Sequence, residues 1–187
     1  NYTTSDGLLD NFVECIAIDI NDNIWFGTSV GAQMFDGVDW TTYTTTNGLV
    51  DDNVKTITTA ANADIWIGTV FGASHFDGVN WLTYDNTNGL VSNQVKSIDE
   101  DENGGIWVGT DQGVSYFAGS SWTSYSSDLH WSGVNATAFD SNGDKWFASP
   151  LGGITHFDGT TFTPYDTSNG LLSQFVTDIL VDNNDNK

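Results

Sequence analysis

Short apolar runs alternate with polar turn clusters along the whole chain of 187 residues. In residues 93–125, NQVKSIDEDENGGIWVGTDQGVSYFAGSSWTSY, β-branched and aromatic runs are separated by Gly, Asn and Asp, and no helical period appears. The pattern predicts four short β-strands in this segment. FDGVDW (35–40) and FDGVNW (76–81) place Asp-Gly between the third and fourth strands. Asp-Gly favours a two-residue hairpin turn there, because both residues tolerate positive φ.

The same pattern returns about every 41 residues. Two aromatic series follow this period, the first Trp25, Trp66, Trp107 and Trp146, the second Trp40, Trp81, Trp122 and the substitute Phe162. A sheet of four short strands cannot bury two apolar faces alone, so the units must pack on one another, and such a period is typical of propeller blades. We therefore expect an all-β fold, a β-propeller of four-stranded antiparallel blades with the in-register aromatic rings buried between blades.

The repeat also sets the expected boundaries. We expect one propeller segment over residues 1–187, made of a partial blade at 1–11, four blades at about 12–45, 53–86, 94–125 and 134–165, and a partial blade at 166–187. The two ends carry copies of one half-unit, since YTTSDGLLDNFVECIAIDINDN matches YDTSNGLLSQFVTDILVDNNDN. This duplication predicts an arc of a larger propeller, with further blades from the same or neighbouring chains, because each end would leave an unpaired edge.

Two long segments carry a family resemblance. GLVDDNVKTITTAANADIWIGTVFGASHFDG (48–78) and GLVSNQVKSIDEDENGGIWVGTDQGVSYF (89–117) resemble the two-component regulator propeller repeat, which occurs in periplasmic sensor regions of hybrid histidine kinases and in secreted bacterial proteins. The resemblance implies a propeller that recognises a small ligand, often a polysaccharide fragment. The matching residues are almost all architectural, so the resemblance transfers the fold better than the function.

The charge of the chain narrows its partners and location. Four basic residues, all Lys, stand against 25 Asp and Glu, which gives a net charge of −21. Long-range repulsion excludes nucleic acid as a partner. No apolar run is long enough to predict insertion into a membrane. Acidity and the resemblance together predict a secreted or periplasmic bacterial protein. The single cysteine, Cys15, allows no intrachain disulfide and is expected to be inert.

Oxygen-rich turns recur between the first and second strands of the units. They read DINDN (19–23), DEDENGG (99–105), DSNGD (140–144) and DNNDN (182–186). Calcium prefers such ligands, and the nominated binder is the cluster Asp99, Asp101 and Glu102. Tight turns favour the same residues because of the backbone conformations they require. The second repeat has AANAD (60–64) at this place. Turn chemistry and calcium therefore both remain open, and no other cofactor is expected.

One connection departs from the repeat. SSDLHWSGVN (126–135) stands where the others read TTTNGLVDDN, DNTNGLVSNQ and DTSNGLLSQF. Trp131 lies outside the repeated aromatic positions, and Phe71 is a second loop aromatic without an assigned packing role. The candidate ligand-binding residues, expected on one loop face, are Trp131, His130, Phe71, Asp128 and Asp111. Alternatively, Trp131 fills the space of the missing leucine.

No catalytic constellation is recognisable. His75 and His156 occupy one repeat position, where a hydrogen-bonded strand histidine is the default interpretation. We expect a non-enzymatic extracellular or periplasmic ligand-binding or sensing module, with a glycan or other small molecule as ligand. One alternative is a surface adhesion or structural repeat protein whose acidic face binds calcium or a protein. A further alternative is an enzyme like the streptogramin lyases, which also use propellers, although their catalytic histidine has no identifiable counterpart here.

Overall fold

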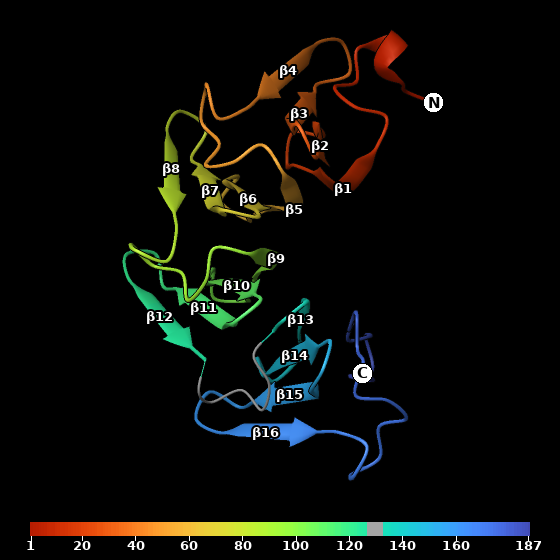
Figure 1. Cartoon of the computed structure of the whole chain (residues 1–187), viewed down its shortest axis with the longest axis vertical. Coiled ribbons are helices and arrows are strands. Elements are labelled where there is room, and N and C mark those ends of the chain that lie inside the picture. The colour runs from red at the N-terminus through yellow and green to blue at the C-terminus, as the bar shows by residue number, and fades with distance from the viewer. Residues whose placement is uncertain (127–132) are drawn as a thin grey trace. The chain divides into compact units, whose positions relative to one another are not determined.

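The computed structural model describes residues 1–126 and 133–187 and contains four four-stranded antiparallel sheets (Figure 1). Each sheet follows chain order, so that consecutive strands are neighbours. The prediction of an all-β fold built from four-stranded antiparallel blades is therefore confirmed. The chain divides into two compact units, one of residues 1–88 and 93–95, the other of residues 89–92 and 96–187.

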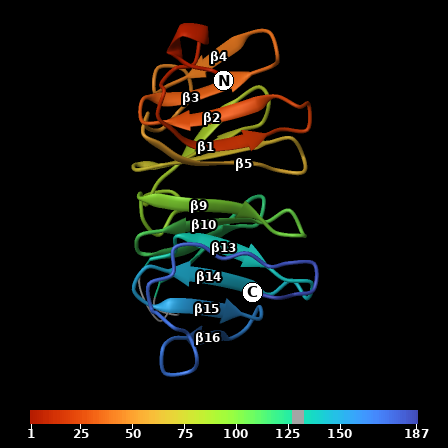
Figure 2. The same ribbon diagram turned by 90° about the vertical axis from the view of Figure 1, so that its right-hand side faces the viewer.

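Two sheets make up the first unit. The 3-10 turn η1 (Thr4–Asp6) precedes them. The first sheet consists of β1 (Val13–Ile18), β2 (Ile24–Thr28), β3 (Gly31–Phe35) and β4 (Trp40–Tyr43), and the second of β5 (Val54–Thr59), β6 (Ile65–Thr69), β7 (Gly72–Phe76) and β8 (Trp81–Tyr84). Strands β1 and β5 lie side by side (Figure 2).

The second unit holds the other two sheets except for Val95, the first residue of the third sheet. They consist of β9 (Val95–Glu100), β10 (Ile106–Thr110), β11 (Gly113–Phe117) and β12 (Trp122–Tyr125), and of β13 (Ala136–Phe139), β14 (Lys145–Ser149), β15 (Gly153–Phe157) and β16 (Phe162–Tyr165). Residues 166–187, expected as part of a further blade, form no strand. They are joined to the fourth sheet by backbone hydrogen bonds, one of which runs from Val176 N–H to the Ser149 carbonyl at 3.1 Å.

The repeated tryptophans form the cores between sheets. In the first unit, Trp25 on the first sheet packs in one cluster with Ile57, Ile65 and Ile67 on the second. In the second unit, Trp107 packs with Phe147 and Phe157 of the fourth sheet. Trp25, Trp66 and Trp107 are no more than 3% exposed, as the repeat predicts. Trp146 is only partly buried, because its face meets the irregular segment near Lys187 instead of a neighbouring sheet.

The Asn-Gly-Leu formula of the connections has a packing cause. Its leucines at positions 49 and 90 are buried, as is Leu8 of the related Asp-Gly-Leu, whereas Leu171 before the irregular C-terminal segment is only partly buried. A side chain on Gly48 would meet the Trp81 ring at 2.4 Å, and one on Gly89 would meet the Trp122 ring at 2.5 Å, so glycine lets the connection lie against the indole of the following sheet. In the fourth sheet Phe162 replaces that tryptophan, and the connection before it is the one that lacks the formula.

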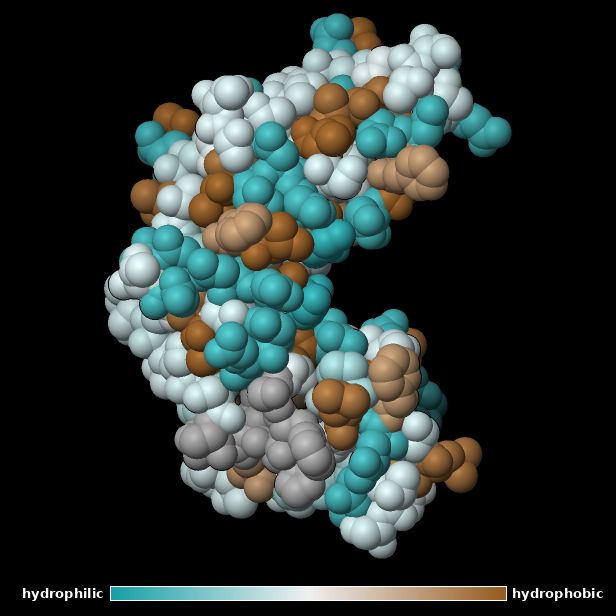
Figure 3. Space-filling view, viewed as in Figure 1, coloured by the Kyte–Doolittle hydropathy of each residue, from teal (hydrophilic) through white to brown (hydrophobic). Residues whose placement is uncertain are grey.

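Hydrophobic residues form small separate groups among hydrophilic ones on the face shown in Figure 3. An apolar stripe also lies along β1, where Ile16 and Ile18 are 60% and 59% exposed. Ile57, the repeat counterpart of Ile16 on β5, is 7% exposed because the first sheet covers it. The same repeat position is thus a core position in one sheet and a surface position in another.

Candidate functional site

The acidic turns serve the tryptophan cores. In the third sheet, Asp101 Oδ1 accepts the backbone N–H groups of Asn103 and Gly105, both at 3.0 Å, and Asp101 Oδ2 accepts the Trp107 indole N–H at 2.9 Å. Asp101 is 6% exposed. One buried carboxylate therefore shapes the turn and satisfies the polar atom of the core indole, which would be costly to bury unpaired.

The same arrangement recurs in two other sheets. Asp19 Oδ2 accepts the Trp25 indole N–H at 3.0 Å, and Asp140 Oδ2 accepts that of Trp146 at 3.0 Å. Burial opposes the ionisation of Asp140, but hydrogen bonds from Trp146, Lys187 and the turn backbone hold its pKa down at about 2. Three turns thus repeat the same set of hydrogen bonds. The spacing of six residues from the turn aspartate to the tryptophan therefore follows from the fold.

The residues nominated for calcium lie in different surroundings. Asp99 is partly buried in β9, Asp101 is engaged as described, and Glu102 is exposed in the turn. Burial, and next the carboxylate of Asp178, raise the pKa of Asp99 to about 7. Within residues 1–126 and 133–187, no group of three or more His, Cys, Asp or Glu side chains could hold a metal ion. Calcium binding stays a prediction.

Both described histidines are bound within their own sheets. His75 Nε2 lies 2.7 Å from Asp64 Oδ2, and its ring stacks on Trp66 with centroids 4.3 Å apart. His156 repeats this with Asp144 at 2.8 Å and Trp146 at 4.4 Å. Each is a hydrogen-bonded strand histidine, as the repeat position predicts.

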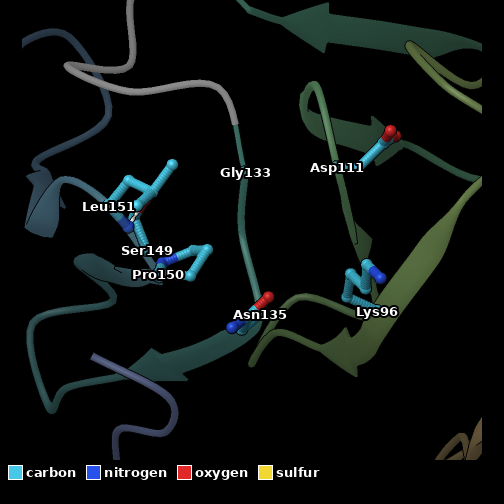
Figure 4. A pocket seen from close by; sticks show the side chains of 7 residues that line it. All are labelled: Lys96, Asp111, Gly133, Asn135, Ser149, Pro150 and Leu151. Carbon is cyan, nitrogen blue, oxygen red and sulfur yellow. Dashed lines mark hydrogen bonds between the residues drawn. The ribbon is translucent and has the colours of Figure 1, made fainter. Parts of the chain in front are cut away.

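A cavity of about 290 Å³ opens between the third and fourth sheets of the second unit. It is lined by Lys96, Asp111, Gly133, Asn135, Ser149, Pro150 and Leu151. Figure 4 shows Pro150 and Leu151 on the turn after β14, Lys96 and Asp111 on the third sheet, and the Gly133–Asn135 segment between them in this view. Val134 N–H donates to the Thr110 carbonyl at 2.8 Å, and this hydrogen bond ties the segment to the third sheet.

The polar lining of this cavity is only partly satisfied by the protein. Asp111 Oδ1 accepts the Ser92 hydroxyl at 2.5 Å. Among the described residues, the side chains of Lys96 and Asn135 have neither a hydrogen bond nor an ion pair. Pro150 and Leu151 add an apolar wall, and Leu151 is 66% exposed. An ammonium group, an amide and a carboxylate therefore face the same space beside apolar carbon, which is the lining typical of a small-molecule site.

The repeat shows how this place differs from its counterpart in the first unit. One repeat position follows a valine in all four repeats and is occupied by Glu14, Lys55, Lys96 and Asn135, in VE, VK, VK and VN. In β1 and β5 the strand register shifts around Glu14 and Lys55, as in a β-bulge, which commonly redirects a side chain. There the two neighbours pair with each other, Lys55 Nζ to Glu14 Oε1 at 3.6 Å. Lys96 and Asn135 form no such pair.

Of the sequence-predicted ligand residues that the structure describes, Asp111 lies at the cavity and Phe71 does not. Trp131, His130 and Asp128 lie outside the described residues. Phe71 is 62% exposed on the turn between β6 and β7 in the first unit, and it does not line the cavity. Asp111 does line it.

Two of the polar cavity residues, Lys96 and Asn135, were not nominated from the sequence. Lys96 and Asn135 lie at one repeat position. A comparison of that position across the four sequence repeats could have indicated them as candidate site residues. Single polar residues on strands otherwise indicate only an exposed side.

Solved structures share this fold. Two extracellular domains of putative hybrid two component systems from B. thetaiotaomicron are similar, one with 23% identity, TM-score 0.78 and 95% of this chain covered, the other with 18%, 0.74 and 95%. The chain spans about a quarter of their length, 25% and 26%. Virginiamycin B lyase from Staphylococcus aureus is similar with 14% identity and TM-score 0.71, over 91% of this chain and 60% of that chain. At these identities the likeness concerns the fold alone.

Sequence comparisons point to one repeat family. No curated protein sequence matches the chain significantly. In the described residues, no helix is long and apolar enough to cross a membrane. The family model described as two component regulator propeller matches residues 7–30 and 89–112. Both segments run from the Gly-Leu connection through the first two strands to the turn that follows. Two segments of the chain, one in the first sheet and one in the third, therefore match the repeat of the two-component regulator propeller family.

Proposed function

We propose that this chain is a ligand-binding part of a secreted or periplasmic sensor, and that the cavity at Lys96 and Asn135 is its binding site. The observation that carries the proposal is the pair of polar side chains that face this cavity without a protein partner in the described residues. The family model and the extracellular sensor domains of similar fold support the sensing role and the location. The volume of about 290 Å³ suits a compact ligand such as a sugar unit.

The lining favours a ligand rich in hydroxyl groups. Asn135 offers amide donors and an acceptor, Asp111 offers its second carboxylate oxygen, and Pro150 offers apolar carbon for the ligand skeleton. A glycan fragment presents this combination. We propose binding without catalysis, because His75 and His156 pair with aspartates inside their own sheets and neither lines the cavity.

A thermal-shift screen of mono- and oligosaccharides and small polar metabolites tests the proposal. Ligands that raise the unfolding midpoint of the wild type are tested again on Asn135→Ala, which removes the amide, and on Gly133→Ala. A Cβ at position 133 would lie 3.6 Å from Pro150 Cδ, an ordinary contact, so Gly133→Ala should fold while narrowing the cavity. Gln112→Ala, an exposed neighbour of Asp111, is the control.

We expect at least one ligand whose shift is lost in both cavity variants and kept in Gln112→Ala. If no compound in the screen depends on the cavity residues, the proposed site is wrong.

A further inference from the structure

The four lysines of the chain differ in one respect. Three of them meet a partner, Lys55 at Glu14 (3.6 Å), Lys145 at the Gly143 carbonyl (2.5 Å) and Lys187 at Asp140 (3.0 Å). Lys96 has no such partner among the described residues, although the chain carries a net charge of −21. The lysine without a partner among the described residues is the one that lines the cavity, which the carboxylate of Asp111 also lines.

In the first unit, the lysine at the repeat position of Lys96 forms an ion pair. Lys55 is the repeat counterpart of Lys96, and its ammonium is paired with a carboxylate from the adjacent strand, that of Glu14. In the second unit the equivalent two positions carry Lys96, in the place of Glu14, and Asn135, in the place of Lys55 and just before β13. The Asn135 amide can donate to an anion but brings no negative charge. This pair of positions therefore carries a cation but not the carboxylate that Glu14 supplies in the first unit.

From this contrast we infer that the cavity selects ligands that carry a carboxylate, with Lys96 and Asn135 donating to its two oxygens. The inference rests on the proposed function of the same cavity. Asp111, which lies on the same side of the cavity as Lys96 in Figure 4, and the buried Ser149 hydroxyl suit hydroxyl groups of the ligand. A hydroxylated carboxylic acid of sugar size, such as a uronic acid, meets both requirements.

Local chemistry decides the preference here. The net charge repels anions at long range, but such repulsion between solvent-exposed charges is screened over about 8–10 Å at physiological salt. A carboxylate in the cavity would make charge-assisted hydrogen bonds, which are roughly twice as strong as neutral ones. Removing the Lys96 charge should therefore weaken binding by about tenfold.

The experiment is isothermal titration calorimetry with matched pairs that differ in the carboxylate, glucuronate against glucose and galacturonate against galactose. The wild type is compared with Lys96→Gln and with Lys55→Gln, the matched control at the same repeat position. Lys96 is exposed, and an unchanged thermal midpoint verifies that its variant is folded.

We expect an acid to bind at least about tenfold more tightly than its neutral partner, Lys96→Gln to lose that preference and Lys55→Gln to keep it. Equal binding of acid and neutral sugar, or an unchanged preference in Lys96→Gln, overturns the inference and leaves the proposed site standing. Absence of binding by all four compounds also overturns it, whereas the proposed function fails only in the wider screen described above.

Discussion

Replacement of Asp101 by Asn tests whether the acidic turns serve the fold. In Asp101→Asn, the side-chain oxygen still accepts the N–H groups of Asn103 and Gly105, while its NH₂ group faces the indole N–H of Trp107. The new NH₂ group and the indole N–H are both donors, so the 2.9 Å hydrogen bond from Trp107 to the Asp101 carboxylate is lost. Position 101 is only 6% exposed, so water cannot readily replace it. Hydrogen bonds to charged groups contribute about 1.5–3 kcal/mol, so the free energy of unfolding should fall by about 2–3 kcal/mol.

The alanine variant extends the series. Asp101→Ala also removes the two backbone acceptor contacts at 3.0 Å and should cost about 3–5 kcal/mol. The control is Asp182→Asn, in an exposed turn where Asp182 Oδ1 accepts two backbone N–H groups in the same way. Its Oδ2 accepts the side-chain amide of Asn186 at 2.9 Å in place of an indole, and that amide can rotate to present its oxygen to the new NH₂ group. We expect its unfolding midpoint to stay at the wild-type value.

Urea unfolding followed by tryptophan fluorescence and by circular dichroism measures these differences. A loss below about 0.5 kcal/mol in Asp101→Asn would refute the assignment of Asp101 to the Trp107 indole. The calcium hypothesis makes a separate prediction, that calcium chloride raises the midpoint of the wild type and not that of Asp101→Asn. Such a result would assign the turn to the metal.

Two further predictions concern burial. The pKa of Asp99 is raised to about 7 by burial and by Asp178, so the folded chain binds a proton that the unfolded chain has lost, and stability falls as the pH rises from about 4 to 7. Asp99→Asn should therefore unfold like the wild type near pH 4 and be more stable at pH 8, by at most about 4 kcal/mol; equal urea midpoints at pH 8 would contradict the raised pKa. Ile57→Ala should cost about 2–5 kcal/mol, whereas Ile16→Ala, at the exposed counterpart, should change stability by about 0.5 kcal/mol or less; equal costs would show that Ile16 is covered in solution.

The fold could be predicted because each structural signal recurs in several repeats of the sequence. Trp25, Trp66 and Trp107 stand at one position of one strand pattern, and three independent copies of a buried ring leave little freedom for another architecture. Trp146 shows the limit of this reasoning. Its burial depends on what covers the sheet, which lies outside the repeat unit itself.

The chemistry of the turns was harder to predict than their position. Clustered oxygens near Asp101 are compatible with a metal or with a turn, and the partner that decides between them, the Trp107 indole, lies six residues further along the chain, in the next strand. The recurrence of that spacing at Asp19 and Asp140 was the available signal.

The cavity is a property of two packed sheets. Asp111 could be nominated because it stands on a loop between strands. Lys96 and Asn135 acquire their significance only where β9 and the segment before β13 come together, and where Lys96 lacks the carboxylate that Lys55 has. Such a difference between equivalent positions follows from pairing across sheets, which no local pattern encodes.

Binding at the Lys96 cavity is tested most directly by NMR, with amide chemical shifts of the ¹⁵N-labelled chain recorded during titration with the best compound of the screen. We expect saturable shifts concentrated at Lys96, Asp111, Gly133, Asn135, Ser149 and Leu151, and their loss in Asn135→Ala. Saturable shifts that leave these residues unchanged and cluster elsewhere, for example around Phe71, would contradict the assignment of the site.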